Sequence, residues 1–594
     1  MSDATHYQPD EFHGLTNSYE SEDQLVVALD FGTTFSGIAY AFANGHKPDV
    51  ISIMDWPGLE GFQQPKVPML ISYDGKGAFT WGGQKHKGDV VQGVKLLLDP
   101  DQPRPLYLPE STAKSDLKRL AKPPVEVAAD FIKAMYQNAM MKIESQIPQE
   151  YLRMCQKEFV LSVPAVWSDK AKDTTLKHTK LTKSKAAKQA GIHPITLIKE
   201  PEAAAMYTLH TLQDRALTVG DAFVICDAGG GTVDLISYEI TQLKPTLELK
   251  ELVPGKGGMA GSLGLNKRFE GAIKSLVGED QYFHLRKSRG FELAVQQFDR
   301  SVKTAFRGDP DEDYFINFPL AELDDDPANN LMANCWNMKG EDVKAIFDPL
   351  ITDIERLVDE QVNLVMVKRM SENHPKADEI KAIFLVGGFG SSEYLKSRLE
   401  ENHSKIQIIQ PHGAWAAIVK GAVLSKLPQE ASIVSNQATR HYGVSALRVF
   451  DPRNDHGQKQ HYDASTGKNR VMMMTWYIYR GEDLMREQSI TFPFYRTLAD
   501  GFTNNQLIFK DELIQSESKN APKHPSPTTT KTNCFLTADL SKVDRSHFKK
   551  RVGADGVDYV DVYYDLVITM KPAVMKFSLE IRGKEIGSVS ANYD

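Results

Sequence analysis

The sequence lacks the features that mark several common classes of protein. Only four cysteines occur among its 594 residues and none forms a C-x-x-C pair, so neither a zinc ribbon nor a dense disulfide framework is indicated. No run of about 18 apolar residues is present, and we therefore expect no membrane span. The net charge of −8 argues against general attraction to nucleic acid, so no nucleic-acid partner is expected.

Basic residues are absent from the beginning of the chain. Residues 1–24 contain six acidic side chains and neither lysine nor arginine. A secretory signal combines a basic start with an apolar centre, and this segment has neither. It is predicted to be a disordered acidic tail. The scattered cysteines are most simply reduced thiols, which favours a cytoplasmic protein, with a nuclear location left open.

An α/β pattern extends from Leu25 to about Leu427. Short apolar strands alternate there with longer helical patterns. The strand candidates include QLVVALDF, EFVLSVPAV, AFVICDAG and AIFLVGGF, and each ends in a polar or glycine-rich turn. Ligands of open α/β sheets bind outside the carboxyl ends of the strands, so these turns are where chemistry is expected.

The pattern changes after Leu427. Residues 560–570 and 576–582 alternate apolar and polar side chains with a period of two, which is typical of half-buried antiparallel strands. A polar, proline-rich segment near 514–533 is predicted to be a flexible loop. We therefore expect residues 428–594 to form a separate β-rich domain, with no long terminal helix.

Three glycine-rich turns stand at predicted strand ends: Asp30–Thr34, Asp227–Thr232 and Gly387–Gly390. Glycine lets successive backbone N–H groups approach an anion closely. An aspartate that opens such a turn can hold Mg²⁺ through water molecules. Two turns of this kind could clamp a triphosphate from both sides. The P-loop pattern GxxxxGK[ST] is absent, so this is not a P-loop protein.

These motifs resemble the 70-kDa heat-shock chaperones, a family of the actin-like ATPase superfold. LDFGTTFSG is similar to the family's first phosphate motif, VICDAGGGTVDL to its second, and FLVGGFGSSEYLKSRL to its adenosine motif. KEPEAAAMY is similar to the connecting motif. The resemblance covers about residues 25–427 and points to an atypical, divergent branch. It implies an α/β, two-lobed ATPase domain with a duplicated ribonuclease-H-like core, followed by the β-rich domain without a helical lid.

The resemblance also implies roles for individual residues. Asp30 and Asp227 would hold Mg²⁺, and Lys95 matches the family's catalytic lysine near the γ-phosphate. Glu200 and Asp234, which with Lys95 and Asp227 form the expected catalytic set, would organise the metal, its waters or the attacking water. The residues expected to contact ATP or ADP are Gly32, Thr33, Thr34, Phe35, Gly229, Gly230, Gly231, Thr232, Asp299, Lys303, Gly387, Gly388, Phe389 and Ser391.

The adenosine side departs from the family pattern. Lys303 stands where the family has an adenine-stacking arginine, and Val302 where a ribose-contacting lysine is usual. Lysine cannot stack as a planar guanidinium does. Ser391 replaces an arginine, Phe389 a serine, and His412 an aspartate. These changes bear on the affinity and selectivity for adenine and leave the phosphate motifs intact.

Charge is also distributed unevenly. One predicted helical stretch has a single acid, Asp173, among the lysines Lys170, Lys172, Lys177, Lys180, Lys183, Lys185 and Lys188. It could dock an acidic partner, RNA or a membrane, but a solvated helix face is the favoured interpretation.

The leading hypothesis is a chaperone-like ATPase. It would bind Mg-ATP in a cleft between two lobes, hydrolyse it slowly and couple nucleotide state to a β-rich module that binds peptide or protein. Its client and co-chaperone are not identified by the sequence. A non-hydrolysing, nucleotide-sensing scaffold that regulates a protein partner is the alternative, and a small-molecule kinase of the same superfold is a third hypothesis.

Overall fold

The computed structural model describes residues 22–44, 48–86, 90–99, 120–180, 195–211, 217–427, 431–571 and 573–593. Nearly all of the predicted acidic tail and the end of the predicted lysine-rich helix lie outside these residues. Within these ranges, no helix has the length and apolar character needed to cross a membrane.

The first large sheet has the strand order β3-β2-β1-β8-β9, with β4 beside β2. Its strands are β1 (Gln24–Asp30), β2 (Phe35–Ala43), β3 (Ile51–Ser52), β4 (Val67–Pro68), β8 (Gln156–Val163) and β9 (Ile195–Lys199). β1 runs antiparallel to β2 and parallel to β8. β1 is buried along nearly its whole length, which explains why its sequence is a continuous apolar run and not an alternating one.

The second large sheet repeats this arrangement in the order β12-β11-β10-β17-β18. Its strands are β10 (Ala222–Ala228), β11 (Val233–Gln242), β12 (Glu248–Glu251), β17 (Ala382–Val386) and β18 (Gln407–Ile409), with β13 (Lys256–Gly258) beside β11. β10 is antiparallel to β11 and parallel to β17, as β1 is to β2 and β8. The predicted α/β strands are therefore confirmed, and the two sheets share one topology.

Two helices pack against each other in the core between the sheets, α6 (Glu200–Thr211) and α12 (Ala417–Leu424). A Cβ on Gly421 would lie 1.7 Å from the carbonyl oxygen of Ala203, so the two helices approach closely because both residues are small. The outer face of the first sheet is covered by α2 (Pro124–Gln146). The outer face of the second is covered by α7 (Leu263–Leu285) and α10 (Gly340–Ser371).

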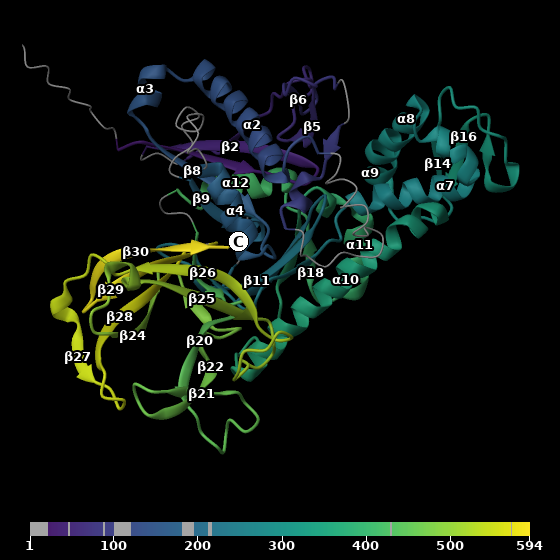
Figure 1. Cartoon of the computed structure of the whole chain (residues 1–594). Helices are drawn as coiled ribbons and strands as arrows, with labels where there is room; N and C mark the ends of the chain where they lie inside the picture. Colours follow the sequence, from purple (N-terminus) through teal and green to yellow (C-terminus); the bar gives the residue numbers. More distant parts are fainter. Residues whose placement is uncertain are drawn as a thin grey trace, which may run out of the picture.

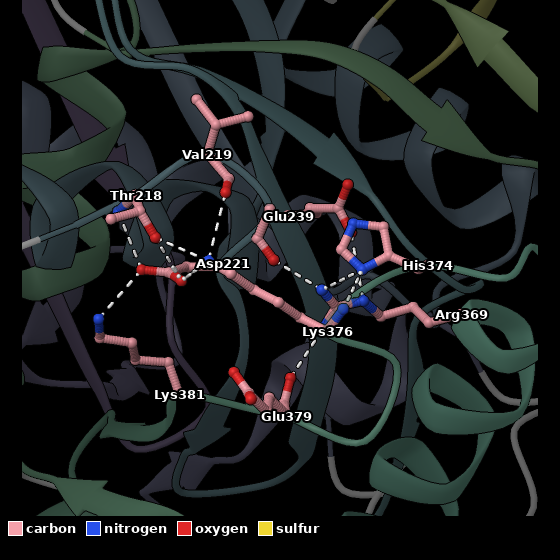
Figure 2. Close-up of polar contacts among 10 residues, drawn as sticks. Thr218, Val219, Asp221, Glu239, Arg369, His374, Lys376, Glu379 and Lys381 are labelled. Carbon is pink, nitrogen blue, oxygen red and sulfur yellow. Dashed lines mark hydrogen bonds and ion pairs between the residues drawn. The ribbon is translucent and has the colours of Figure 1, made fainter.

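A polar cluster joins the end of α10 to the residues that precede β10 (Figure 2). The guanidinium of Arg369 is fully buried and donates to the carbonyl oxygens of Gly220 (2.6 Å) and Glu379 (2.7 Å). It also lies 3.3 Å from a carboxylate oxygen of Glu239 and 2.9 Å from Nδ1 of His374. A buried guanidinium needs such partners because an unpaired charge is costly away from water. The cluster thus anchors the C-terminal end of α10.

The β-rich segment forms a sheet with the order β21-β22-β20-β25-β26-β30-β29-β28-β24, with β27 beside β28. Its strands are β20 (His441–Val449), β21 (Gln460–Asp463), β22 (Lys468–Ile478), β24 (Ser489–Ala499), β25 (Ile508–Ser516), β26 (Lys531–Asp539), β27 (Lys549–Val552), β28 (Asp558–Met570), β29 (Met575–Ile581) and β30 (Lys584–Asn592). The sheet folds over an apolar interior in which the rings of Tyr477 and Phe492 stack 3.7 Å apart. The antiparallel strands predicted at 560–570 and 576–582 are confirmed as β28 and β29. Figure 1 shows these strands gathered on one side of the molecule, with β21 and β22 extending furthest from the rest.

The proline-rich loop between β25 and β26 spans residues 517–530. The carbonyl oxygen of Lys523 accepts from the backbone N–H of Met474 (2.9 Å), and that of Pro522 from the indole N–H of Trp476 (2.7 Å). Both donors belong to β22, so the middle of this loop is hydrogen-bonded along that strand.

Two short strands of the C-terminal segment also extend the second large sheet. β19 (Ser432–Gln437) pairs in parallel with β12, and β23 (Asp483–Met485) pairs with β19. Other elements are α3 (Gln149–Met154), α4 (Asp169–Lys180), α8 (Arg289–Gln297), α9 (Lys303–Ala305), α11 (Glu393–Asn402), β5 (Leu70–Tyr73), β6 (Phe79–Trp81), β7 (Val91–Gln92), β14 (Asp313–Asn317), β15 (Leu331–Met332) and β16 (Cys335–Lys339).

Candidate nucleotide and metal site

The first two glycine-rich turns occupy equivalent positions in the two sheets. Asp30 is the last residue of β1, and its turn leads into β2. Asp227 lies at the end of β10, and its turn leads into β11. Both aspartates are buried, at 1% and 3% exposure. The shared topology therefore brings two similar strand–turn–strand units to the same region.

The two turns touch each other. A Cβ added to Gly230 would lie 2.1 Å from Oγ1 of Thr34, and one added to Gly231 would lie 2.5 Å from Oγ1 of Thr33. A third glycine, Gly261, packs on the second turn, since its Cβ would lie 2.4 Å from the backbone nitrogen of Gly231. Only glycine permits such an approach. The structure thus brings the predicted phosphate residues of the two turns together.

Lys95 and Glu200 form a buried ion pair beside these turns. Lys95 lies in a short 3₁₀ helix, η1 (Val94–Leu97). Burial alone would lower the pKa of Lys95, but the carboxylates of Glu200 and Asp30 outweigh it and raise that pKa, so the ammonium stays charged. Burial raises the pKa of Glu200 to about 7 against the opposing charge of Lys95, with Asp30 and Asp234 adding to the increase.

Asp30 has two partners that the sequence reasoning missed. The ammonium of Lys66 lies 2.7 Å from Oδ2 of Asp30, and the hydroxyl of Ser162 donates to Oδ1 (2.8 Å). Burial would raise the pKa of Asp30, yet the charges of Lys66 and Lys95 hold it below its usual value. Lys66 stands just before β4, where a single lysine beside a proline carries no recognisable pattern. Ser162 is the next-to-last residue of β8, and the only hint of its role was that the strand predicted there ends at the same edge of the sheet as β1.

Asp227 and Asp234 face each other across the β10–β11 register. Oδ1 of Asp227 and Oδ2 of Asp234 are buried and have no hydrogen-bond partner within the described residues. Oδ1 of Asp234 accepts from the backbone N–H of Ala165 (3.0 Å). Burial, followed by the charges of Glu200 and Asp234, raises the pKa of Asp227 well above its usual value. A nearby cation would relieve this cost.

The charges around the turns fit a divalent cation. Four buried carboxylates, Asp30, Glu200, Asp227 and Asp234, surround the two buried lysines Lys66 and Lys95. When all six groups are ionised, two negative charges remain. Oxygen ligands and unpartnered carboxylate oxygens suit Mg²⁺. In the described part of the chain no three His, Cys, Asp or Glu side chains converge closely enough to hold a metal ion together. The residues present therefore fit a Mg²⁺ ion that keeps most of its waters and takes one or two carboxylate ligands.

The adenosine-side residues are arranged differently. Lys303 is 2.6 Å from Oδ1 of Asp299 and 3.1 Å from Oδ1 of Asn266, so its ammonium is held by its own neighbours. The hydroxyl of Ser391 donates to the carbonyl oxygen of Gly388 (2.8 Å). Phe389 is buried in the core behind the turn.

Other residues named from the family pattern lie nearby. Gly387 adopts a φ of +83° and packs on Asp227, since its Cβ would lie 2.4 Å from Oδ1 of that residue. Val302 is buried, and His412 is exposed, with its backbone carbonyl accepting from the hydroxyl of Tyr207.

Trp415 links the first turn to the third and was also missed from the sequence. Its ring meets that of Phe35 edge-on, with centroids 5.4 Å apart. A Cβ on Gly388 would lie 3.8 Å from its indole nitrogen. An isolated tryptophan just before α12 gave no signal in the sequence that it would reach these turns.

Comparison with known proteins identifies relatives for most of this chain. No protein-family model matches it. It is 25% identical to heat shock 70 kDa protein 12B of Homo sapiens over 520 residues, which cover 72% of each chain. It is 26% identical to heat shock 70 kDa protein 12A of Homo sapiens over 532 residues, covering 73% of this chain and 74% of that protein. The chaperone protein DnaK of Buchnera aphidicola is 23% identical over 429 residues, covering 67% of this chain and 60% of the relative.

The chain is a divergent relative of the 70-kDa heat-shock proteins. The resemblance predicted from its motifs is thereby confirmed at the level of the family.

In this heat-shock-like chain, the β-rich segment packs directly on the α/β part. The hydroxyl of Tyr442 and the amide of Asn533 both donate to Oδ2 of Asp169, each at 2.9 Å. The backbone N–H of Gln437 donates to Oε2 of Glu251 (3.2 Å). Further along, Arg486 forms an ion pair with Glu202 of α6. The two parts therefore meet through polar groups as well as through the β12–β19 pairing.

The same region corrects one expectation. Lys172 belongs to the stretch expected to be a solvated helix face, but its side chain is only 10% exposed. Burial lowers its pKa, partly opposed by Asp169, whose carboxylate is 3.9 Å away. The helix turns Lys172 toward the protein because α4 packs on β9 and β26.

Proposed function

We propose that this protein is a chaperone-like ATPase that binds Mg-ATP or ADP between the two large sheets and hydrolyses ATP slowly. The observation that carries the proposal is the contact between two glycine turns from separate sheets, flanked by buried carboxylates and Lys95. The shared strand order of the sheets supports an actin-like arrangement of two lobes with a duplicated core.

Each group has a chemical role in this proposal. The backbone N–H groups of Gly230 and Gly231 and the ammonium of Lys95 would bind phosphate, while the N–H of Gly229 donates to the carbonyl oxygen of Thr232 within the turn. Asp227 and Asp234 would hold the metal through their unpartnered oxygens. Magnesium, when bound, neutralises charge on the phosphates. Glu200, with a pKa of about 7, is suited to take a proton from water.

Calorimetry with purified protein tests binding. We expect Mg-ATP and Mg-ADP to bind with one site per chain, and no heat of binding with either nucleotide would refute the proposal.

Single-turnover hydrolysis then tests whether the protein is an enzyme. Slow release of phosphate supports an ATPase, whereas none over hours favours the non-hydrolysing scaffold. Stoichiometric phosphorylation of a metabolite would favour the small-molecule kinase.

We further propose that nucleotide state is coupled to the β-rich segment through the start of α6. Glu200 faces Lys95, and Glu202, in the same turn of the helix, pairs with Arg486. A movement of this turn would therefore act on both ion pairs, one beside the phosphate turns and one at the β-rich segment. Amide hydrogen exchange tests this coupling. We expect exchange in β19, β23 and the start of β24 to differ between ATP and ADP, and identical exchange would contradict the coupling.

The β-rich segment is proposed to bind an extended peptide. β20 pairs with β22 along Tyr442–Val449 but with β25 only along His441–Val444. Its outer part, with Leu447 and Val449 exposed, therefore offers an edge for strand addition. No α-helix follows β20 in residues 441–571 and 573–593. Anisotropy of fluorescent apolar peptides, compared with acidic ones of equal length, measures this binding.

A further inference from the structure

Strand pairing fixes the position of Lys66 beside the first phosphate turn. β4 pairs with the start of β2, Ser36 opposite Val67 and Phe35 opposite Pro68. This pairing places the Lys66 side chain against Gly37. A Cβ added to Gly37 would lie 3.2 Å from Cγ of Lys66. Gly37 is the residue opposite Asp30 in the β1–β2 register. The lysine side chain is 6% exposed, so its ammonium is enclosed next to Asp30.

The three aspartates around the turns differ in the hydrogen-bond partners that the chain supplies to their carboxylate oxygens. Both oxygens of Asp30 are engaged, Oδ2 by Lys66 and Oδ1 by Ser162. Asp227 and Asp234 each keep one buried oxygen without a hydrogen-bond partner in the described part of the chain. A cation that approaches Asp30 must compete with an ammonium 2.7 Å away. The charge of Lys66 also acts on Asp227, but Oδ1 of Asp227 has no hydrogen-bond partner in the described residues and stays open to a cation. The resemblance implies that Asp30 holds Mg²⁺. The positive charge of Lys66 opposes that role.

We propose that Lys66 is a further positioning residue of this site: it serves as the fixed counter-ion of Asp30, confines the divalent cation to Asp227 and Asp234, and supplies positive charge for phosphate. The inference rests on the proposed nucleotide and metal site. Lysine acts at phosphates as a compact point charge, so an ammonium held at the turn suits this use. The site then binds phosphate with less dependence on metal than a site in which Asp30 is free.

The decisive test is the affinity for metal alone, measured with Mn²⁺ by electron paramagnetic resonance. Lys66→Met removes the competing charge and frees Asp30, so we expect Mn²⁺ to bind about tenfold more tightly, or better. Lys76→Met, in the exposed turn between β5 and β6, should leave the affinity unchanged, and Asp227→Asn should weaken it. A gain of affinity cannot arise from loss of folding. Unchanged or weaker Mn²⁺ binding in Lys66→Met would overturn the inference.

If Lys66→Met does not fold, Lys66→Gln takes its place, because its amide can still donate to Asp30 without carrying a charge. Circular dichroism and a thermal melt establish folding for each variant. The expected gain in Mn²⁺ affinity is the same, and its absence is equally decisive.

Calorimetry with ADP, in EDTA and in Mg²⁺, provides the second measurement. We expect the ratio of the dissociation constant in EDTA to that in Mg²⁺ to rise about tenfold or more in Lys66→Met. The variant loses a positive charge that acts on phosphate even without metal. An unchanged ratio contradicts the role in phosphate binding. If the wild type binds no ADP in either condition while Lys66→Met still gains Mn²⁺ affinity, the proposed function fails and the role of Lys66 at the metal stands.

Discussion

Glu202 of α6 forms an ion pair with Arg486, which lies 284 residues later in the β-rich segment. The side chain of Glu202 is 1% exposed and that of Arg486 is 24% exposed, so the pair is largely shielded from water. Two residues earlier, Glu200 holds Lys95 beside the phosphate turns. One turn of one helix thus connects the candidate site with the β-rich segment.

Arg486→Met should destabilise the protein strongly, because it leaves Glu202 as an uncompensated buried charge. We expect the free energy of unfolding to fall by about 3–5 kcal/mol, as measured by urea denaturation. Arg289→Met is the control. Arg289 and Glu292 form an ion pair with both side chains more than half exposed, and its loss should cost about 1 kcal/mol or less. Equal effects of the two substitutions would show that Glu202 is not held by Arg486.

Gly230→Ala tests the contact between the two turns. The new Cβ would lie 2.1 Å from Oγ1 of Thr34, so the turns must separate. We expect the dissociation constant for ADP, measured by calorimetry, to rise at least about tenfold, which corresponds to about 1.4 kcal/mol.

Gly271→Ala is the matched control for that experiment. Gly271 lies within α7, and its Cβ would meet no atom within 4 Å. It should leave ADP binding unchanged and stabilise the helix by about 0.5–1 kcal/mol. Normal ADP affinity in Gly230→Ala would rule out the proposed clamp.

Lys95→Ala should abolish turnover and largely preserve nucleotide binding. The ammonium is buried beside Glu200, where it can stabilise charge on a transferring phosphoryl group, while the glycine turns still hold the phosphates. Single-turnover hydrolysis and calorimetry on the same preparation separate the two effects. Hydrolysis at the wild-type rate would remove Lys95 from the catalytic set.

The stability of the protein should depend on pH through Asp221, in the cluster beside the second large sheet in Figure 2. Burial would raise the pKa of Asp221, but hydrogen bonds from Lys376 (2.6 Å) and the backbone N–H of Thr218 (2.9 Å) bring it well below its usual value. The ionised form therefore stabilises the folded protein above about pH 4, the range of an unfolded aspartate. This contribution is lost as the pH falls toward the lower folded pKa.

Asp221→Asn isolates that contribution. We expect the substitution to lower the free energy of unfolding by about 2 kcal/mol at pH 7 and by progressively less between pH 4 and pH 2. The wild type loses the same interaction when Asp221 is protonated. Urea denaturation across this range measures the difference. A difference that stays constant with pH would mean that the charge of Asp221 does not contribute.

Much of the α/β fold follows from local features of the sequence. Each glycine turn comes directly after an apolar strand, as in β1 and β10, and both the period of the strand and the chemistry of the turn are properties of a few neighbouring residues. The alternation in β28 and β29 likewise reveals which side chains face the interior. The family motifs then connect the turns to one site before any contact is known.

The partners of the site's charges required the tertiary structure. Lys66 reaches Asp30 only because β4 pairs with β2, and Trp415 meets Phe35 only because the two sheets come together. The buried state of Lys172 depends in the same way on packing against the β-rich segment. None of these contacts leaves a periodic trace in the sequence around it.

What the sequence determined by itself is therefore the set of strands, the glycine turns and the family to which the phosphate motifs point. The tertiary structure decided which carboxylates are already neutralised by lysine, which keep an unpartnered oxygen, and which connect to the β-rich segment. The reason is physical. Turn and strand preferences act between neighbours along the chain. Buried charges instead pair because folding brings together, in a low-dielectric interior, groups more than a hundred residues apart, such as Lys95 and Glu200.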